Sequence, residues 1–421
     1  MARLGRTFAF RLALVAAAGV ALRLIYLLTL GRHVTGIGDW FFYHWQANDI
    51  AAGRGFVEPF RLRFDHVSLP SAGHPPLYPL VLSGMSELGG TSTLAHRAVG
   101  LPLGAATIAL VGLLGRRAGG ERTGLVAAGL CAIYPIMIAT DGALMSETLY
   151  GPLVALFLLG AWRMLEQPGR LVAAGSGAVL GLAALTRSEA LLLLPLVTWP
   201  AAVRGGRGWA LRAGAATLAC VVVIAPWTIR NLDVFGRFVP ISNNDSTVLA
   251  GANCGLTYHG RNLGGWDINC ISTRRLDNEA AQAAVWRSQG LNYASDHAGR
   301  LPAVMAVRLL RVWDLWQPRR QVLFDEGRQL RMSQAGVAAF YVLCVLGAMG
   351  AVALRRRRRP LLVLLAPALA VSVAAVIGYG IPRLRHGFEI PLLVLAAAGV
   401  VALREGTVRL PSRRRSLERA A

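Results

Sequence analysis

The chain has 421 residues, of which 54% are hydrophobic and only 16% are charged, which is too apolar for an ordinary soluble globular protein. Its formal net charge is +22, and all 44 basic residues are arginines. These arginines gather in clusters between apolar segments, and no soluble face collects them, which excludes a nucleic-acid-binding protein and indicates an integral membrane protein.

Apolar segments recur along the whole chain, and several approach the roughly 20 residues that a helix needs to cross a bilayer core. In chain order they are 8–30, 93–115, 124–138, 151–164, 171–185, 190–203, 213–229, 335–354, 361–379 and 390–403. The first contains Arg11 and Arg23 and is longer than the apolar part of a signal peptide, so we expect a retained anchor. The pattern predicts an all-α integral membrane protein of about ten transmembrane helices, with 1–421 as a single membrane domain.

Arginine clusters follow every second predicted span, which is the distribution that the positive-inside rule describes. The clusters are Arg3, Arg6 and Arg11; Arg116, Arg117 and Arg122; Arg163 and Arg170; Arg204, Arg207 and Arg212; Arg355 to Arg359; and Arg413 to Arg415. An even number of spans then places both termini in the cytoplasm of a multi-pass plasma (inner) membrane protein. The external segments become 33–92, 139–149, 187–189, 231–332 and 381–389, and 333–404 holds the last helices. Because nearly all acidic residues and histidines lie in those segments, we expect any chemistry on the outer face.

The two longest outer segments carry patterns of helices that lie in the membrane interface. In 33–92 these are 43–52, which mixes aromatic and polar residues, and the proline-rich 74–79. In 231–332 they are 278–297 and the aromatic, charged stretch 308–316. Cys254 and Cys270 share this second segment, so a disulfide between them is one alternative in an oxidising compartment, and free thiols are the other.

Ionisable side chains stand at the outer ends of different predicted spans, where they are costly and often functional. They are Asp39, Asp141, Glu147, Arg187, Glu189, Arg230, Arg383 and Arg385. If the helices bundle, these ends converge on one cavity that holds a carboxylate base together with guanidinium groups suited to phosphate. The alternative is structural, in which Arg187 pairs with Glu189 and the last two arginines reach lipid headgroups.

Asp39 is set among aromatic residues, Trp40, Phe41, Phe42, Tyr43 and Trp45. Tryptophan and tyrosine commonly mark the membrane interface. Aromatic rings also stack on sugar faces and exclude water, which would make a carboxylate a stronger base. Both interpretations apply to this stretch.

A series of motifs follows in order: "FYHWQANDIAAGRGF" after Asp39, "HPPLYPL" from His74, "SETLY" from Ser146, "ALTRSEALLLLP" from Ala184, "APWTIRNLDVFGRFVPIS" from Ala225 and "RLRHGFEIPLLVLAAAG" from Arg383. This succession, over nearly the whole chain, resembles the GT-C membrane glycosyltransferases. It is most similar to the bacterial branch related to protein O-mannosyltransferases and lipid A aminoarabinose transferases. The resemblance implies a GT-C-type bundle with interfacial helices in both long outer segments.

The resemblance also implies a function, namely inverting transfer of a sugar from a polyprenyl-phosphate-linked donor to an acceptor hydroxyl at the outer face. Asp39 matches the family's base, and Arg383, Arg385 and Arg187 match positions near the donor phosphate. We assign supporting roles in the site to Tyr43, His74, Asp141, Glu147, Glu189 and Arg230, of which Glu147 and Glu189 stand in motifs that recur in the family. Protein mannosyltransferases carry an aspartate–glutamate pair where this chain has Asp39 and Trp40, so a glycan or lipid acceptor is favoured over a protein.

Other functions remain as alternatives. A transporter or flippase of a lipid-linked sugar would show polar residues at mid-membrane and broken helices, whereas here the polar residues lie at one face. A GT-C-shaped assembly partner without catalysis would not need Asp39 and the outer arginines. The cytoplasmic loops are too short for a nucleotide-sugar site. The sequence specifies no cofactor. A divalent cation is one alternative, because oxygen and nitrogen ligands are available from Asp39, His44, His74, Asp141 and Glu147. These residues do not show the short spacing that is typical of a metal site.

Overall fold

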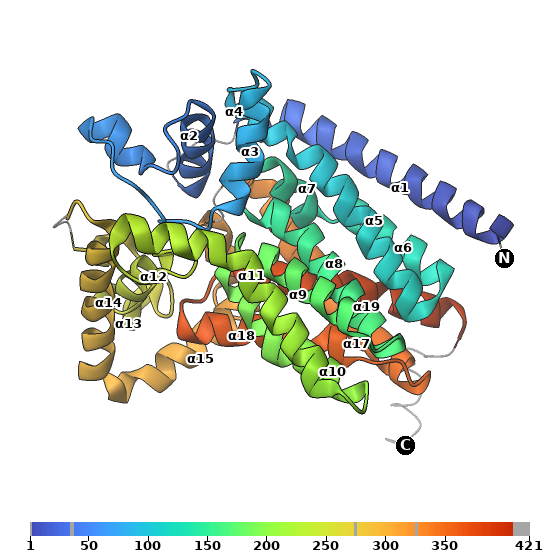
Figure 1. The fold of residues 1–421 in the computed structure, drawn as a ribbon. Helices are drawn as coiled ribbons and strands as arrows, with labels where there is room; N and C mark the ends of the chain where they lie inside the picture. The colour runs from blue at the N-terminus through green and yellow to red at the C-terminus, as the bar shows by residue number, and fades with distance from the viewer. Residues whose placement is uncertain (1, 34–37, 273–275, 325–326, 407–421) are drawn as a thin grey trace.

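The structure is a computed structural model that describes residues 2–33, 38–272, 276–324 and 327–406 (Figure 1). The described residues form a helical protein in which the one β-type pairing is an isolated bridge between Val57 and Pro70. The α-helices are α1 (Ala2–Thr29), α2 (Asp39–Ala51), α3 (Leu77–Glu87), α4 (Thr93–Ala98), α5 (Gly100–Gly119), α6 (Glu121–Ile133), α7 (Pro135–Gly142), α8 (Glu147–Glu166), α9 (Arg170–Ala184), α10 (Trp199–Arg204), α11 (Trp209–Phe235), α12 (Asn244–Ala252), α13 (Gly255–Tyr258), α14 (Glu279–Asp296), α15 (Leu301–Val312), α16 (Pro318–Gln321), α17 (Leu330–Arg356), α18 (Leu362–Ile377) and α19 (His386–Arg404). The predicted all-α class is confirmed.

Six helical segments in the described part of the chain are long and apolar enough to cross a membrane. They are Thr7–Thr29, Thr93–Gly119, Glu147–Glu166, Trp209–Phe235, Leu330–Arg356 and Pro382–Arg404. A seventh is formed if α6 and α7 count as one span, although they are bent by 57° at the break before Pro135. Proline has no N–H to continue the ladder of the preceding helix, which accounts for the bend. The chain is therefore a multi-pass membrane protein.

The predicted count of about ten spans is not confirmed, because three predicted segments are short or irregular in the structure. Segments 171–185 and 361–379 form α9 and α18, which have 15 and 16 residues. At about 1.5 Å per residue such helices reach roughly 23 Å, short of a hydrocarbon core of about 30 Å. Segment 190–203 is divided into a 3₁₀ turn, a π turn and the short α10, with Pro195 and Pro200 interrupting its hydrogen bonds.

The most buried span is α19, which runs through the middle of the bundle (Figure 1). It contacts α5, α6, α8, α17 and α18. The approach to α17 is close enough that a Cβ atom on Gly350 would lie 1.8 Å from the carbonyl oxygen of Leu395, so only glycine fits there. This packing fixes the start of α19, and with it the preceding 3₁₀ turn Pro382–Arg385, at one end of the bundle.

Arginines and their partners gather at the other end. Arg116 pairs with Glu121 at 2.8 Å, Arg117 pairs with Glu166, and Arg357 pairs with Glu405 at 2.5 Å. Arg116 also lies over the ring of Phe8, 4.4 Å from its centroid, which brings in the first turns of α1. We call this the arginine-rich end. The side chains of Arg3 and Arg6, and all of Arg413 to Arg415, lie outside the described residues.

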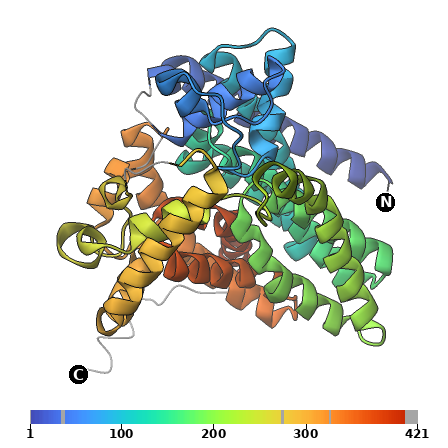
Figure 2. The same cartoon turned by 60° about the vertical axis from the view of Figure 1, so that its left-hand side comes forward.

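The segments predicted to be external lie together at the end away from the start of α1 (Figure 1). Here α2 and α3 hold the first outer segment and α12 to α15 hold the second, and Figure 2 shows both in front of the bundle. The carboxylate of Glu279 joins the two segments, because it accepts hydrogen bonds from Ser71 Oγ at 2.6 Å, from the backbone N–H of Ala72 at 3.0 Å and from Asn243 Nδ2 at 2.9 Å. The location of this end outside the cell remains a prediction.

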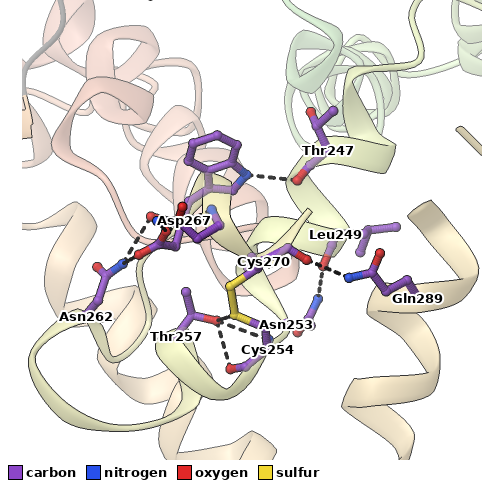
Figure 3. Close-up of a disulfide and its surroundings, with 12 residues drawn as sticks. Thr247, Leu249, Asn253, Cys254, Thr257, Asn262, Asp267, Cys270 and Gln289 are labelled. Atoms are coloured by element: carbon purple, nitrogen blue, oxygen red, sulfur yellow. Dashed lines mark hydrogen bonds between the residues drawn. A yellow bond between two sulfur atoms is a disulfide. The ribbon is translucent and has the colours of Figure 1, made fainter. Parts of the chain in front are cut away.

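Cys254 and Cys270 are joined by a disulfide in the second outer segment, with their Cα atoms 6.0 Å apart (Figure 3). Hydrogen bonds fasten the loop around it. Trp266 Nε1 donates to the carbonyl oxygen of Thr247 at 2.8 Å, and Gln289 Nε2 donates to that of Cys270 at 2.6 Å. The disulfide thus closes the loop 254–270, and the hydrogen bonds hold the loop against α12 and α14.

Replacing both cysteines by serine is expected to loosen this loop and leave the bundle intact. A disulfide that closes a loop of about 15 residues contributes about 3 kcal/mol. We therefore expect hydrogen exchange of the amides in 254–270 to accelerate by about two orders of magnitude, with exchange in α17 and α19 unchanged. Unchanged exchange in the loop would show that the hydrogen bonds alone hold it.

Candidate active site

Five of the predicted site residues form a continuous chain of ion pairs at the end opposite the arginine-rich end. Arg383 Nη2 lies 2.8 Å from Asp39 Oδ2, and Arg383 Nε lies 2.7 Å from Glu147 Oε1. The same Glu147 oxygen is 2.8 Å from Arg187 Nη1, and Arg187 Nε is 2.6 Å from Glu189 Oε1. The chain thus alternates carboxylate and guanidinium groups from Asp39 to Glu189.

Each of these side chains is placed by the end of a helix. Asp39 and Glu147 are the first residues of α2 and α8, where a carboxylate interacts favourably with the helix dipole. Arg187 lies three residues after the end of α9, just before a 3₁₀ turn, and Arg383 follows Pro382 in the 3₁₀ turn before α19. Helix ends from four parts of the sequence therefore meet at one site.

Exposure is lowest in the middle of the chain of ion pairs and higher at both ends. The side chains of Asp39 and Glu189 are 30% and 25% exposed, those of Arg383 and Arg187 are 10% exposed, and that of Glu147 is fully buried. The two guanidinium groups therefore lie deeper than the Asp39 carboxylate. Glu147 lies at the base of the site, between the two arginines.

The electrostatics keep Asp39 ionised. Burial raises the pKa of its carboxyl group, but the Arg383 guanidinium and His74 more than offset this, so that the pKa lies below its ordinary value. His74 Nε2 is 3.8 Å from Asp39 Oδ1, and Nδ1 of the same ring is 3.3 Å from the Tyr43 hydroxyl. Burial lowers the pKa of His74, which leaves the ring neutral at pH 7. Asp39 is thus an ionised carboxylate beside a neutral imidazole.

Arg385 lies in a second cluster that sequence reasoning missed. Its guanidinium pairs with Asp314, and with Glu389 at 2.9 Å, and it lies over the Phe340 ring at 3.8 Å. Tyr134 donates a hydrogen bond to the same Glu389 oxygen at 3.1 Å. The Arg385 side chain is 2% exposed and both carboxylates are buried. The only sequence signal for Asp314 was its place in the aromatic stretch 308–316.

The structure places Asp141 and Arg230 in contacts of their own. Asp141 pairs with Arg23 of α1 at 2.5 Å, and Arg23 also donates to the carbonyl oxygens of Gly19 and Ala132 at 3.2 Å. Arg230 donates to the backbone of the first outer segment, at the carbonyl oxygens of Ser71 and Phe56. These contacts tie α1 to α7, and α11 to the first outer segment.

No group of three or more potential metal ligands occurs among the described residues. Of the five ligands considered from sequence, Asp39 and His74 adjoin each other, and Glu147 is joined to Asp39 only through Arg383. His44 instead pairs with His96, with their Nδ1 atoms 2.9 Å apart. In the described part of the chain, these residues therefore do not form a site that fits a divalent cation.

Comparisons with known proteins identify the fold. Residues 73–229 match the family described as dolichyl-phosphate-mannose-protein mannosyltransferase. The oligosaccharyltransferase AglB of Archaeoglobus fulgidus, in complex with an inhibitory peptide and a dolichol-phosphate, is 16% identical, with a TM-score of 0.59 over 98% of this chain and 52% of that one. Its apo form gives a TM-score of 0.56 at the same identity and coverage. This chain has the GT-C fold.

The predicted resemblance to the GT-C superfamily is thereby confirmed. The chain spans about half the length of the AglB structures that it matches, 52% in the first of them. ArnT of Cupriavidus metallidurans bound to undecaprenyl phosphate is 18% identical over 95% of this chain and 81% of that one, with a TM-score of 0.43. No curated protein matches the sequence. The matched family region contains His74, Glu147 and Arg187, while Asp39 and Arg383 lie on either side of it.

Proposed function

We propose that this GT-C protein transfers a sugar from a polyprenyl-phosphate-linked donor to an acceptor hydroxyl at the outer face of the plasma membrane. The observation that carries the proposal is the chain of ion pairs from Asp39 through Arg383 and Glu147 to Arg187. It combines an ionised carboxylate at the surface with two guanidinium groups behind it. The dolichol-phosphate in the AglB complex supports a lipid phosphate as the donor's leaving group.

In this proposal the Asp39 carboxylate is the general base. It accepts the proton of the acceptor hydroxyl while the acceptor oxygen forms a bond to the anomeric carbon. The bond from that carbon to the phosphate oxygen breaks, and its electron pair leaves with the polyprenyl phosphate. Because attack and departure occur on opposite sides of the sugar, the anomeric configuration is inverted.

Arg383 and Arg187 hold the leaving phosphate. Guanidinium groups bind phosphate oxygens through paired N–H donors, and they neutralise the charge that develops as the bond breaks. Glu147 sets the spacing of the two arginines and offsets their repulsion, since one of its oxygens contacts both. A phosphate that enters competes with Asp39 for Arg383, which weakens the ion pair and makes the carboxylate a stronger base. Donor binding would in this way activate the base.

The remaining predicted residues support the site in this proposal. His74 and Tyr43 line the approach to Asp39, and Glu189 orients Arg187. Arg385, which the resemblance assigns to the phosphate, acts as a positioning residue because two buried carboxylates already engage it. Asp141 and Arg230 hold the helices and the first outer segment that carry the site.

The experiment that tests this function supplies the purified protein with a panel of radiolabelled polyprenyl-phosphate sugars and with envelope extracts as acceptors. The proposal expects label to move into the acceptor fraction with one or a few of the sugars. Label that stays on the lipid for every sugar, while the protein binds those lipids, would contradict it.

Arg383→Gln is expected to weaken donor binding and to move the acidic limb of the pH–rate profile upward. The substitution removes the cation that lowers the pKa of Asp39, while burial, which raises that pKa, remains. Asp39 then takes up its proton at higher pH, and kcat/KM falls earlier as the pH decreases. The wild-type limb due to Asp39 lies below the ordinary carboxyl pKa, so the two profiles separate on their acidic side, with the limb of the variant at the higher pH. Profiles that coincide would show that Arg383 does not act on the base.

A further inference from the structure

An open groove of about 820 Å³ lies between α5, α8 and α9 near the arginine-rich end, away from the proposed active site. Its apolar wall consists of Leu113 from α5, Leu156 from α8 and Val179 from α9. Leu113 and Leu156 belong to membrane spans and are 39% and 42% exposed, so this face borders hydrocarbon in a bilayer. The groove is therefore open to a lipid chain.

A glycine on α9 leaves part of the groove open. Gly160 and Gly175 line it, and a Cβ atom on Gly175 would meet no other atom within 4 Å. The position of Gly175 therefore faces empty space. A side chain placed there would start from open space and extend into the groove that Gly175 lines.

Three arginines, Arg116, Arg117 and Arg163, line the same groove. Arg116 pairs with Glu121 at 2.8 Å and Arg117 pairs with Glu166. The exposed side chain of Arg163 has no ion pair within the part of the chain that the structure describes. Three cations against two carboxylates leave the groove with a net positive charge next to an apolar wall. An amphiphile with a negative head and a hydrocarbon tail complements both features.

We infer that this groove binds an anionic glycerophospholipid of the leaflet at the arginine-rich end. An acyl chain lies along Leu113, Leu156 and Val179, and the headgroup phosphate contacts Arg163. A second copy of the chain fits less well, because a two-fold contact through this face would bring the arginines of both copies together. The inference does not depend on the proposed catalytic function.

The experiment counts the lipids that remain on the protein by native mass spectrometry after purified protein is titrated with phosphatidylglycerol or with phosphatidylcholine. Wild-type protein is expected to retain one phosphatidylglycerol in preference to phosphatidylcholine. Arg163→Gln is expected to weaken phosphatidylglycerol binding about fivefold, the usual contribution of one arginine near an anionic lipid. Arg170→Gln is the matched control, because Arg170 is exposed at the start of α9 and does not line the groove.

Gly175→Leu fills the groove and is expected to abolish the retained lipid. Gly214→Leu is its control, since Gly214 lies in α11, outside the groove, and likewise has no atom within 4 Å of its Cβ position. Both variants gain the same helix propensity, so a difference in the lipid that they retain arises from the groove. Equal retention in Gly175→Leu and wild type, or equal retention of the two lipids, would overturn the inference. A change of oligomeric state in Gly175→Leu alone would assign the groove to a second copy instead.

Discussion

Asp39→Asn is expected to lower the rate of sugar transfer about a hundredfold or more while donor binding is retained. Removal of a general base typically costs this much, and asparagine keeps the shape of the side chain and an oxygen that can accept from Arg383. The measurement is a single-turnover transfer rate beside the dissociation constant of the donor. A loss that appears in the rate constant and not in the dissociation constant assigns Asp39 to the chemical step.

Asp245→Asn is the matched control for this prediction. Asp245 is another aspartate of the outer segments that pairs with an arginine, at 2.5 Å from Arg287 Nε, and its side chain is 53% exposed. We expect its transfer rate to equal that of the wild type. An Asp39→Asn protein that transfers sugar at the wild-type rate would remove Asp39 from the mechanism.

Arg385→Gln is expected to destabilise the protein strongly, by about 3–5 kcal/mol, which is usual when one partner of a buried ion pair is removed. The change leaves the carboxylates of Asp314 and Glu389 buried without their shared cation. Arg383→Gln should destabilise the protein less, because Glu147 remains paired with Arg187 and Asp39 remains next to His74. Thermal unfolding in one detergent, with the two variants beside the wild type, measures the difference.

A second substitution separates a positioning role of Arg385 from direct phosphate binding. Adding Asp314→Asn to Arg385→Gln removes one of the two stranded carboxylates and should recover part of the lost stability. If Arg385 only positions the site, any donor binding that Arg385→Gln loses should be regained together with the stability. An Arg385→Gln protein that is as stable as the wild type but no longer binds donor would restore Arg385 to the phosphate site, as the family resemblance implies.

The sequence allowed the grouping of Asp39, Glu147, Arg187 and Arg383 to be predicted, because charged residues at the outer ends of different spans can converge when the spans form one bundle. The same argument also placed Asp141, Arg230 and Arg385 in that group, but they have other partners. The sequence did not show that Arg383 and Arg385 have different roles, and both were assigned to the donor phosphate. These residues are two apart in a 3₁₀ turn, so they point in different directions, and only the packing of Asp314 against that turn decides where Arg385 goes.

The span count shows a similar limit. Hydropathy locates apolar segments, but it does not show that α9 and α18 stop after 15 and 16 residues, or that prolines divide 190–203. The ion pair between Asp141 and Arg23 was also not predicted, because Arg23 was considered only as an interruption of the first apolar segment. Such contacts depend on which helices are neighbours, and periodicity carries no information about that.

The most direct test of the central claim follows sugar and lipid together in vesicles that contain the purified protein, a labelled polyprenyl-phosphate sugar and an acceptor extract. We expect each sugar gained by the acceptor to be matched by one polyprenyl phosphate released, and both products to disappear with Asp39→Asn. Labelled lipid that crosses the vesicle membrane with its sugar still attached, at a rate that Asp39→Asn does not change, would contradict the account and make the protein a transporter.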